Sequence, residues 1–325
     1  MFVSSINLVS EVEKLWHENK VNVEKNLDKW LYACKDGESK IRNARKEFHQ
    51  WNPLKVYVSV DKAKLKKNFI FSLRFFGQEV AELFVKDKFN LMLHINKNHK
   101  NNNEKYFKNN LKEGKYFWNS KEAKDFRAFF KKLIIDQNGT PKIKSTEHRI
   151  ESKFIEEMLK GSGKFGQPGI KIQPIKLGGC PLQFPIPFAA NTGKPLAKTG
   201  HIDILARRKA KNNKTRLSVW ELKRPNTYKK AASQAFIYAL QLLKILRSDK
   251  GNEWYNLFGF TGKVPKSLEV EAVVAITANQ KNRFDFEKEN FVKNEINGDV
   301  IKLYAVYYEE QPRAIRFLED SFRLD

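Results

Sequence analysis

The hydrophobic pattern at the start of the chain predicts a helix followed by a sheet. Apolar residues recur at roughly helical spacing from Leu8 to Cys34, which predicts one long helix there. Short runs with alternating apolar positions then predict four closely spaced strands, which is typical of an antiparallel meander. These strands are expected at Val56–Val60, Phe69–Phe75, Val80–Val85 and Phe89–Ile95.

A polar stretch and a second helix follow the expected strands. Residues 98–114 include three consecutive asparagines and are expected to form an exposed loop. Asn119 with Glu122 three residues later resembles a capping box, which predicts a helix through about Ile135. Residues 136–145 contain Asn-Gly and a proline, a composition typical of a linker. We therefore expect a basic α+β domain over residues 1–140 and a second domain over residues 145–325.

The second half of the chain alternates helical and strand patterns. Helices are expected over about Thr146–Leu159 and Thr227–Leu246. This order of elements indicates an α/β fold, with a mixed central sheet flanked by helices. The strands are expected at Ile170–Ile175, His201–Arg207, Leu217–Lys223, Glu269–Thr277 and Ile301–Tyr308.

Positive charge is concentrated in the middle of the chain. The 61 Lys and Arg exceed the 37 Asp and Glu, and residues 51–250 hold 42 of the basic groups against 16 of the acidic ones. Such a field attracts polyanions, of which nucleic acid is the commonest inside cells. The alternative is an AT-rich genome, which raises the number of lysines and asparagines together.

The two cysteines and the apolar runs narrow the class of protein further. Cys34 and Cys180 lie far apart, which excludes a disulfide scaffold and a CxxC metal site and favours a reducing, cytoplasmic location. The first 20 residues carry three glutamates and no apolar stretch typical of a signal peptide. No window approaches about 18 uninterrupted apolar residues, so no membrane partner is expected.

Three charged residues interrupt two otherwise apolar strands. Alternation along residues 217–223 places Glu221 and Lys223 on one face, and Asp203 lies between apolar neighbours in the preceding strand. Burying such groups is costly unless they are paired or bind a metal. A structural ion pair of Lys223 with either carboxylate is one interpretation. The other is a Mg²⁺ site, because two carboxylates are hard oxygen ligands of the kind that Mg²⁺ prefers.

The order of these residues resembles a known family. Gly200-His201-Ile202-Asp203, then Glu221-Leu222-Lys223, then Gln234 and Tyr238 four residues apart is similar to the PD-(D/E)xK nuclease superfamily, in its QxxxY branch, which includes RecB-like nucleases. The matched pieces cover about residues 147–310. One position departs from the family, which has proline where Ile202 stands here.

The resemblance implies a restriction-endonuclease-like C-terminal domain and a set of site residues. Asp203 and Glu221 would bind Mg²⁺, with Mn²⁺ as a substitute ion, and Lys223 would be the catalytic lysine. Gln234 and Tyr238 would lie near the site on the following helix. The family also places a glutamate on the helix before the sheet, and both Glu147 and Glu151 are candidates. Glu151 is preferred because it lies beside the buried stripe of its helix.

Basic and aromatic residues are the candidate contacts to nucleic acid. The basic groups around the predicted site are expected to contact backbone phosphates, although a solvated face is the alternative. Aromatic residues of the first domain, among them Phe107, Phe117 and Trp118, could stack on bases or form core. The basic candidates are Arg207, Arg208, Lys211, Arg224, Lys229 and Lys230.

These observations together predict a metal-dependent nuclease that hydrolyses phosphodiester bonds of DNA, an endonuclease of restriction, defence or repair. A non-catalytic nucleic-acid-binding protein on a nuclease-like fold and an RNA-directed nuclease are the alternatives from the same residues. An interaction protein whose charge reflects genome bias is a third. A homodimer and a complex with a defence or repair partner both remain open.

Overall fold

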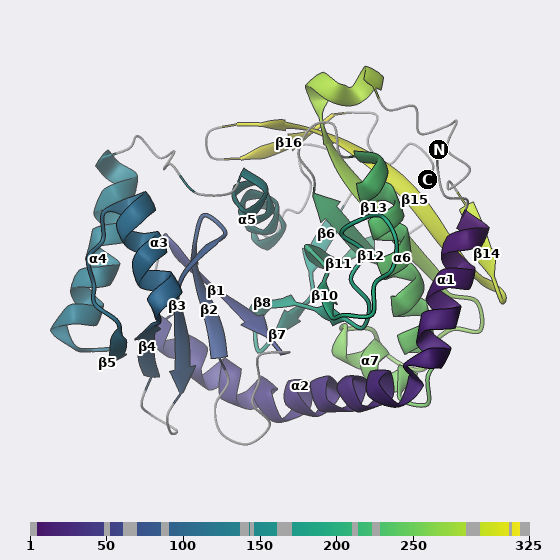
Figure 1. Cartoon of the computed structure of the whole chain (residues 1–325), viewed down its shortest axis with the longest axis horizontal. Coiled ribbons are helices and arrows are strands. Elements are labelled where there is room, and N and C mark those ends of the chain that lie inside the picture. Colours follow the sequence, from purple (N-terminus) through teal and green to yellow (C-terminus); the bar gives the residue numbers. More distant parts are fainter. Residues whose placement is uncertain are drawn as a thin grey trace. The chain divides into compact units, whose positions relative to one another are not determined.

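The computed structural model of the chain is mixed α/β (Figure 1) and divides into two compact units. Unit 1 consists of Met1–Leu31, Phe154–Ile175 and Gln183–Asp325, and unit 2 of Tyr32–Lys153 and Lys176–Leu182. The structure describes residues 5–48, 53–60, 70–85, 91–136, 143, 146–160, 171–209, 214–222, 228–283, 293–311 and 314–318.

This division departs from the expected split at residues 140–145, because each unit takes a segment from the other side of it. Helix α1 (Ser5–Glu18) packs on α6 (Tyr228–Leu246), so the start of the chain belongs to unit 1. Residues 176–182 instead belong to unit 2. Of the expected linker, all but residues 136 and 143 lie outside the described residues.

The first expected helix is two helices. Helix α1 ends at Glu18, and α2 (Lys20–Phe48) follows after Asn19. The side-chain amide of Asn19 donates to the carbonyl oxygen of Leu15 at 2.9 Å, which satisfies one of the acceptors that a helix end leaves open. An asparagine that bonds the local backbone competes with the continuation of a helix, and this interruption is not visible in apolar spacing.

Unit 2 is built on a sheet whose strand order is β5-β4-β3-β2-β1-β8-β7. The pairs from β1 to β5 are antiparallel, which confirms the predicted meander. The side chains of Phe71, Leu73 and Phe75 alternate along β2 and are fully buried. The strands are β1 (Leu54–Ser59), β2 (Ile70–Phe75), β3 (Gln78–Val85), β4 (Leu91–Ile95), β5 (Gly114–Phe117), β7 (Lys176–Leu177) and β8 (Cys180–Gln183).

The expectation of a loop over residues 98–114 is wrong for most of that stretch, which forms α3 (Lys97–Phe107). Asn96 is the N-cap: its side chain accepts from the N–H of His99 at 2.9 Å. The His99 ring accepts the N–H of Asn96 in return at 3.4 Å, which completes a capping box. Histidine in place of the usual Glu or Gln hides this signal in the sequence.

Helix α4 (Lys121–Asp136) confirms the predicted second helix, with a different cap. The hydroxyl of Ser120, not the side chain of Asn119, accepts the N–H of Ala123 at 3.3 Å. Phe130 of α4 is fully buried, with its ring centroid 4.8 Å from that of Phe75. The aromatic face of α4 therefore covers the sheet of unit 2.

Unit 1 is built on a mixed sheet in the order β14-β15-β13-β12-β11-β6, with β16 paired to β15. Strand β13 is parallel to both of its neighbours, and the other pairs are antiparallel. All five strands predicted for the second half are present. The strands are β6 (Lys171–Pro174), β11 (Ile204–Lys209), β12 (Thr215–Leu222), β13 (Glu269–Thr277), β14 (Lys293–Ile296), β15 (Asp299–Glu310) and β16 (Ile315–Phe317).

Helices cover this sheet, as a strand buried on both faces requires. Trp220 of β12 stacks on Phe317 at 6.0 Å and lies 5.9 Å from Phe154 of α5 (Thr146–Leu159), as ring centroids. Helix α6 packs against β12, β13 and β15. Short elements complete the unit: β9 (Pro185–Ile186), β10 (Gly200–His201), α7 (Gly251–Leu257) and the 3-10 helix η1 (Ala278–Arg283). In the described part of the chain, no helix combines the length and apolarity needed to cross a membrane.

Candidate functional site

Asp203 and Glu221 come together at one end of the β11–β12 pair. The antiparallel register pairs Ile204 with Trp220, so one step further along the chain Asp203 stands level with Glu221. Oδ2 of Asp203 accepts the backbone N–H of Leu222 at 2.9 Å, which fixes the aspartate against β12. The Glu221 side chain is fully buried, whereas Asp203 is half-buried. Two of the three predicted charged residues therefore occupy one place.

Gln234 and Tyr238 of α6 are buried and bonded to one another. Nε2 of Gln234 donates to the Tyr238 hydroxyl oxygen at 3.2 Å, and the backbone N–H of Ala190 donates to the same oxygen at 3.2 Å. Oε1 of Gln234 is buried and has no hydrogen-bond partner among the described residues. Because a buried acceptor without a donor is costly, this oxygen is suited to a water molecule or ligand group.

The charges of the two carboxylates affect the pKa of Tyr238 in the Gln234–Tyr238 pair. Burial raises the pKa of Tyr238 above its usual value, and the negative charges of Glu221 and, more weakly, Asp203 raise it further. The tyrosine therefore stays neutral over the physiological range and keeps a hydroxyl proton that it can donate. Asp203 and Glu221 therefore lie within electrostatic reach of Tyr238, which Gln234 contacts directly.

Gly200 makes the close packing of this site possible. A Cβ atom at this position would lie 2.7 Å from Cα of Ala189 and 2.9 Å from the Tyr238 hydroxyl oxygen. Real Cβ atoms do not approach other atoms so closely, so only glycine fits without movement of the neighbours. The glycine that opens the Gly-His-Ile-Asp motif thus lets its strand lie directly against α6.

The donor set of the site fits a divalent cation. Two carboxylates that share a partly buried place repel one another, and the repulsion disfavours ionisation of both. A divalent cation removes that repulsion, and one or two carboxylates with water and substrate phosphate are the usual ligands of Mg²⁺ in proteins. Asp203 and Glu221 are the residues of unit 1 that would hold such an ion.

Several predicted site residues lie outside the described residues. These are Lys223, Lys211 and Arg224, together with the side chain of Lys229. Lys230, by contrast, is described and exposed near the start of α6. The roles predicted for all five stay predictions.

The prediction that Arg208 contacts nucleic acid is wrong. Its side chain is fully buried and pairs with the equally buried Glu271 of β13, at 2.6 Å and 2.8 Å. Arg208 lies on β11, and only the packed structure shows that its guanidinium is buried against the neighbouring strands. The neighbouring Arg207 is half-buried and donates to the carbonyl oxygen of Gly259.

Glu151 belongs to unit 2, where it has partners of its own. Its Oε1 pairs with the buried Arg74 at 3.3 Å, and its Oε2 lies 3.4 Å from Nδ1 of His148. These contacts explain why Glu151 can be buried. Glu147 is half-buried on the same helix. The assisting role at the metal that the resemblance implies for Glu151 stays a prediction.

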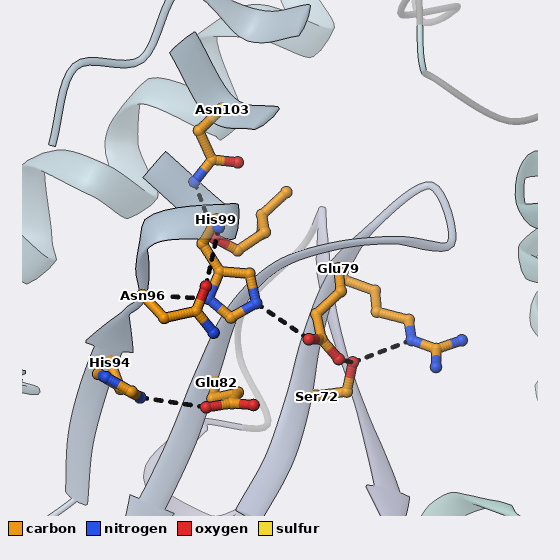
Figure 2. A network of polar contacts seen from close by, with 9 residues as sticks. Ser72, Glu79, Glu82, His94, Asn96, His99 and Asn103 are labelled. Atoms are coloured by element: carbon orange, nitrogen blue, oxygen red, sulfur yellow. Dashed lines mark hydrogen bonds and ion pairs between the residues drawn. The ribbon is translucent and has the colours of Figure 1, made fainter. Parts of the chain in front are cut away.

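A second group of potential ligands lies in unit 2, and sequence reasoning missed it (Figure 2). Glu79 and Glu82 of β3 and His99 of α3 offer ligand atoms within 4.8 Å of one another and could hold a metal ion. Nε2 of His99 lies 2.9 Å from Oε1 of Glu79, and Nδ1 of His94 lies 3.1 Å from Oε2 of Glu82. The group depends on α3, which the polar sequence did not indicate.

Hydrogen bonds already occupy much of this group. Nδ1 of His99 accepts the Asn96 N–H, so the neutral ring carries its proton on Nε2 and donates it to Glu79. Binding of a metal at Nε2 would require the other tautomer and the loss of that capping bond. Ser72 donates to the remaining oxygen of Glu79. These hydrogen bonds explain the group without a metal ion, as a network that connects α3 to the sheet.

The aromatic residues of unit 2 divide between core and surface. Phe107 and Trp118 are buried, at 3% and 4% exposed, so neither can stack on a base. Phe117 on the edge strand β5 is 54% exposed. Of the three, only Phe117 remains a candidate for stacking.

Comparison of the chain with family models, with curated proteins and with solved structures gave no match.

Proposed function

We propose that the chain is a metal-dependent nuclease that hydrolyses phosphodiester bonds of DNA. The observation that carries the proposal is the meeting of Asp203 and Glu221 at the end of two paired strands, beside the Gln234–Tyr238 pair. This grouping follows the order of the PD-(D/E)xK motif in its QxxxY branch, as in RecB-like nucleases. The mixed sheet of unit 1, with α6 and Phe154 of α5 packed against it, supports a restriction-endonuclease-like fold for this unit.

Each residue has a distinct part in this reaction. A Mg²⁺ ion bound to Asp203 and Glu221 would polarise the phosphoryl oxygen and lower the pKa of a bound water. The Leu222 N–H holds Asp203 in position for that ion. Lys223, two residues beyond Glu221, would sit at the attacking water and neutralise charge on the phosphate. Gln234 and Tyr238 are positioning residues that hold the α6 side of the site.

Charge supports nucleic acid as the substrate. The net charge of +24 draws a polyanion to the protein, and Lys230 remains an exposed cation near the start of the helix that carries Gln234 and Tyr238. Arg208 takes no part in that attraction because Glu271 neutralises it inside the sheet. Phosphate contacts near the site therefore fall to fewer residues than the sequence indicated.

The experiment that tests the function is a nicking assay on closed circular DNA with Mg²⁺, Mn²⁺ or EDTA. We expect cleavage with either metal and none with EDTA. Asp203→Asn and Glu221→Gln should each abolish cleavage, because each removes one of the two charged ligands that would hold and position the Mg²⁺ ion. Asp249→Asn is the matched control: it removes an exposed carboxylate after α6 and should leave cleavage unchanged.

The same assay separates the alternatives. Full cleavage activity of Glu221→Gln would contradict the assignment of Glu221 to the metal site. DNA binding without cleavage under every metal condition would favour a non-catalytic protein on a nuclease-like fold. Cleavage of an RNA substrate but not of DNA would favour the RNA-directed nuclease.

A further inference from the structure

A cavity of about 330 Å³ lies in unit 1 beside the turn between α1 and α2. One wall comes from the start of α2 and the other from the segment that joins β9 to β10. Its volume is at the lower end of the range of about 300–1,000 Å³ for ligand pockets. The cavity therefore suits a small ligand or one unit of a longer chain.

The lining of the cavity carries positive charge and hydrogen-bond donors. Lys25 and Lys198 line it from opposite walls, both are exposed, and neither has an ion-pair partner among the described residues. The amide of Asn22 and the hydroxyl of Thr199 also line it. None of the described lining residues is a carboxylate. Two cations without an anion, flanked by neutral donors, form a site for an anion.

Helix α6 holds the wall of the cavity that carries Lys198. Oε1 of Gln241 accepts the N–H of Phe188 at 2.8 Å, and Nε2 of Gln241 donates to the Phe188 carbonyl at 2.9 Å. The N–H of Ala189 donates to the Lys198 carbonyl at 2.7 Å. Because both strands of this wall are bonded, Lys198 is carried on a fixed backbone rather than on a loose loop.

The same wall leads directly to the candidate active site. Thr199 precedes Gly200, which packs against Tyr238, and Asp203 follows Thr199 by four residues. Four residues span at most about 14 Å. At the rise of about 3.4 Å per nucleotide in duplex DNA, that is the reach of about four nucleotides.

We propose that this cavity is a phosphate subsite, in which Lys25 and Lys198 hold the backbone of a nucleic-acid strand a few nucleotides from the bond that is cut. The inference rests on the proposed function for the identity of the ligand. It gives the turn between α1 and α2, which the packing of α1 on α6 places in unit 1, a role beside the candidate active site.

The test measures binding of a fluorescein-labelled single-stranded oligodeoxynucleotide by anisotropy, in EDTA and over a series of salt concentrations. The variant Lys25→Gln/Lys198→Gln should weaken binding by about two- to 25-fold, as expected for the loss of two exposed ion pairs. The slope of log K against log salt should fall by about 0.7 for each lost phosphate contact on a single strand.

Two further variants control for net charge and for folding. Lys263→Gln/Lys266→Gln removes two exposed lysines of unit 1 outside the cavity and should leave affinity and slope near the wild type. Asn22→Asp, nearly isosteric, adds a carboxylate to the lining that holds the two lysines and should weaken binding without a change in melting temperature. Equal losses in the cavity and control variants, or no loss in either cavity variant, would overturn the subsite.

The readout distinguishes this inference from the proposed function. If the cavity variants lose affinity but neither they nor the wild type cleave DNA with any metal, the result supports the phosphate subsite and contradicts the proposed nuclease activity. If the wild type cleaves with Mg²⁺ and the cavity variants bind and cleave normally, the result supports the nuclease activity and contradicts the phosphate subsite.

Discussion

At the scale of single residues, the candidate site depends on close packing as much as on charge. Tyr238 is held by two donors, and its hydroxyl oxygen lies where any side chain at position 200 would collide with it. Nε2 of Gln234 donates to this hydroxyl oxygen, whereas the buried Oε1 of Gln234 has no hydrogen-bond partner among the described residues. A site of this kind tolerates little change in shape.

Gly200→Ala tests this packing. We expect a loss of about 1–3 kcal/mol in the free energy of unfolding, because the new methyl group must displace Ala189 or Tyr238. Urea denaturation measures the loss. In a Tyr238→Phe background the same substitution should cost less, since one of the two collisions is gone. Equal costs in both backgrounds would show that Tyr238 does not press on Gly200.

At the scale of elements, buried charge links the strands of unit 1. Arg208 of β11 reaches Glu271 of β13 past the intervening β12, whose Arg216 also lies 3.5 Å from Glu271. The guanidinium of Arg208 further lies 5.2 Å from the ring centroid of Tyr304 on β15. These contacts make Arg208 part of the sheet's interior rather than of its binding surface.

Arg208→Ala should therefore act on stability and not on DNA affinity. We expect a loss of about 3–5 kcal/mol in the free energy of unfolding, because Glu271 would keep a buried charge with one partner fewer. Arg208→Met/Glu271→Leu should lose less than the sum of its single variants. Urea denaturation gives both values. Reduced DNA affinity of a fully stable Arg208→Ala protein would instead restore the phosphate contact.

At the scale of the whole molecule, each of the two compact units is built from segments that are not contiguous in the sequence. Leu8 and Val12 of α1 are fully buried in unit 1, and Lys250 after α6 pairs with Asp28 of α2 at 2.7 Å. Unit 2 has a core of its own around Phe75 and Phe130. Each unit thus has the separate core that an independently stable domain needs.

Amide hydrogen exchange can test the assignment of α1 to unit 1. Leu8→Ala should cost about 2–5 kcal/mol and speed exchange in α6 and β12, with little change in β2 and β3. Phe130→Ala, which removes a buried ring of unit 2, should give the opposite distribution. If both variants speed exchange everywhere, the two units unfold as one.

Much of the architecture was predictable because it rests on local patterns. The apolar alternation around Phe71 and the run around Val273 predict strands at the right places, since pleated strands bury alternate or all side chains. The spacing of Asp203, Glu221 and Gln234 likewise identified residues that the structure groups together. These signals survive in the sequence because each depends on neighbours within one element or on a fixed order of elements.

Other features required the tertiary structure because they depend on contacts between distant residues. Nothing local distinguishes the buried Arg208 from the half-buried Arg207 beside it, since the difference is Glu271, 63 positions away. The cap that His99 completes, the cavity shared by Lys25 and Lys198, and the place of α1 beside α6 are equally invisible in the chain. A sequence determines which residues form a strand or helix. Which charges are paired inside, and which remain for a ligand, is decided only when the elements pack, because burial and partnership are properties of the assembled core.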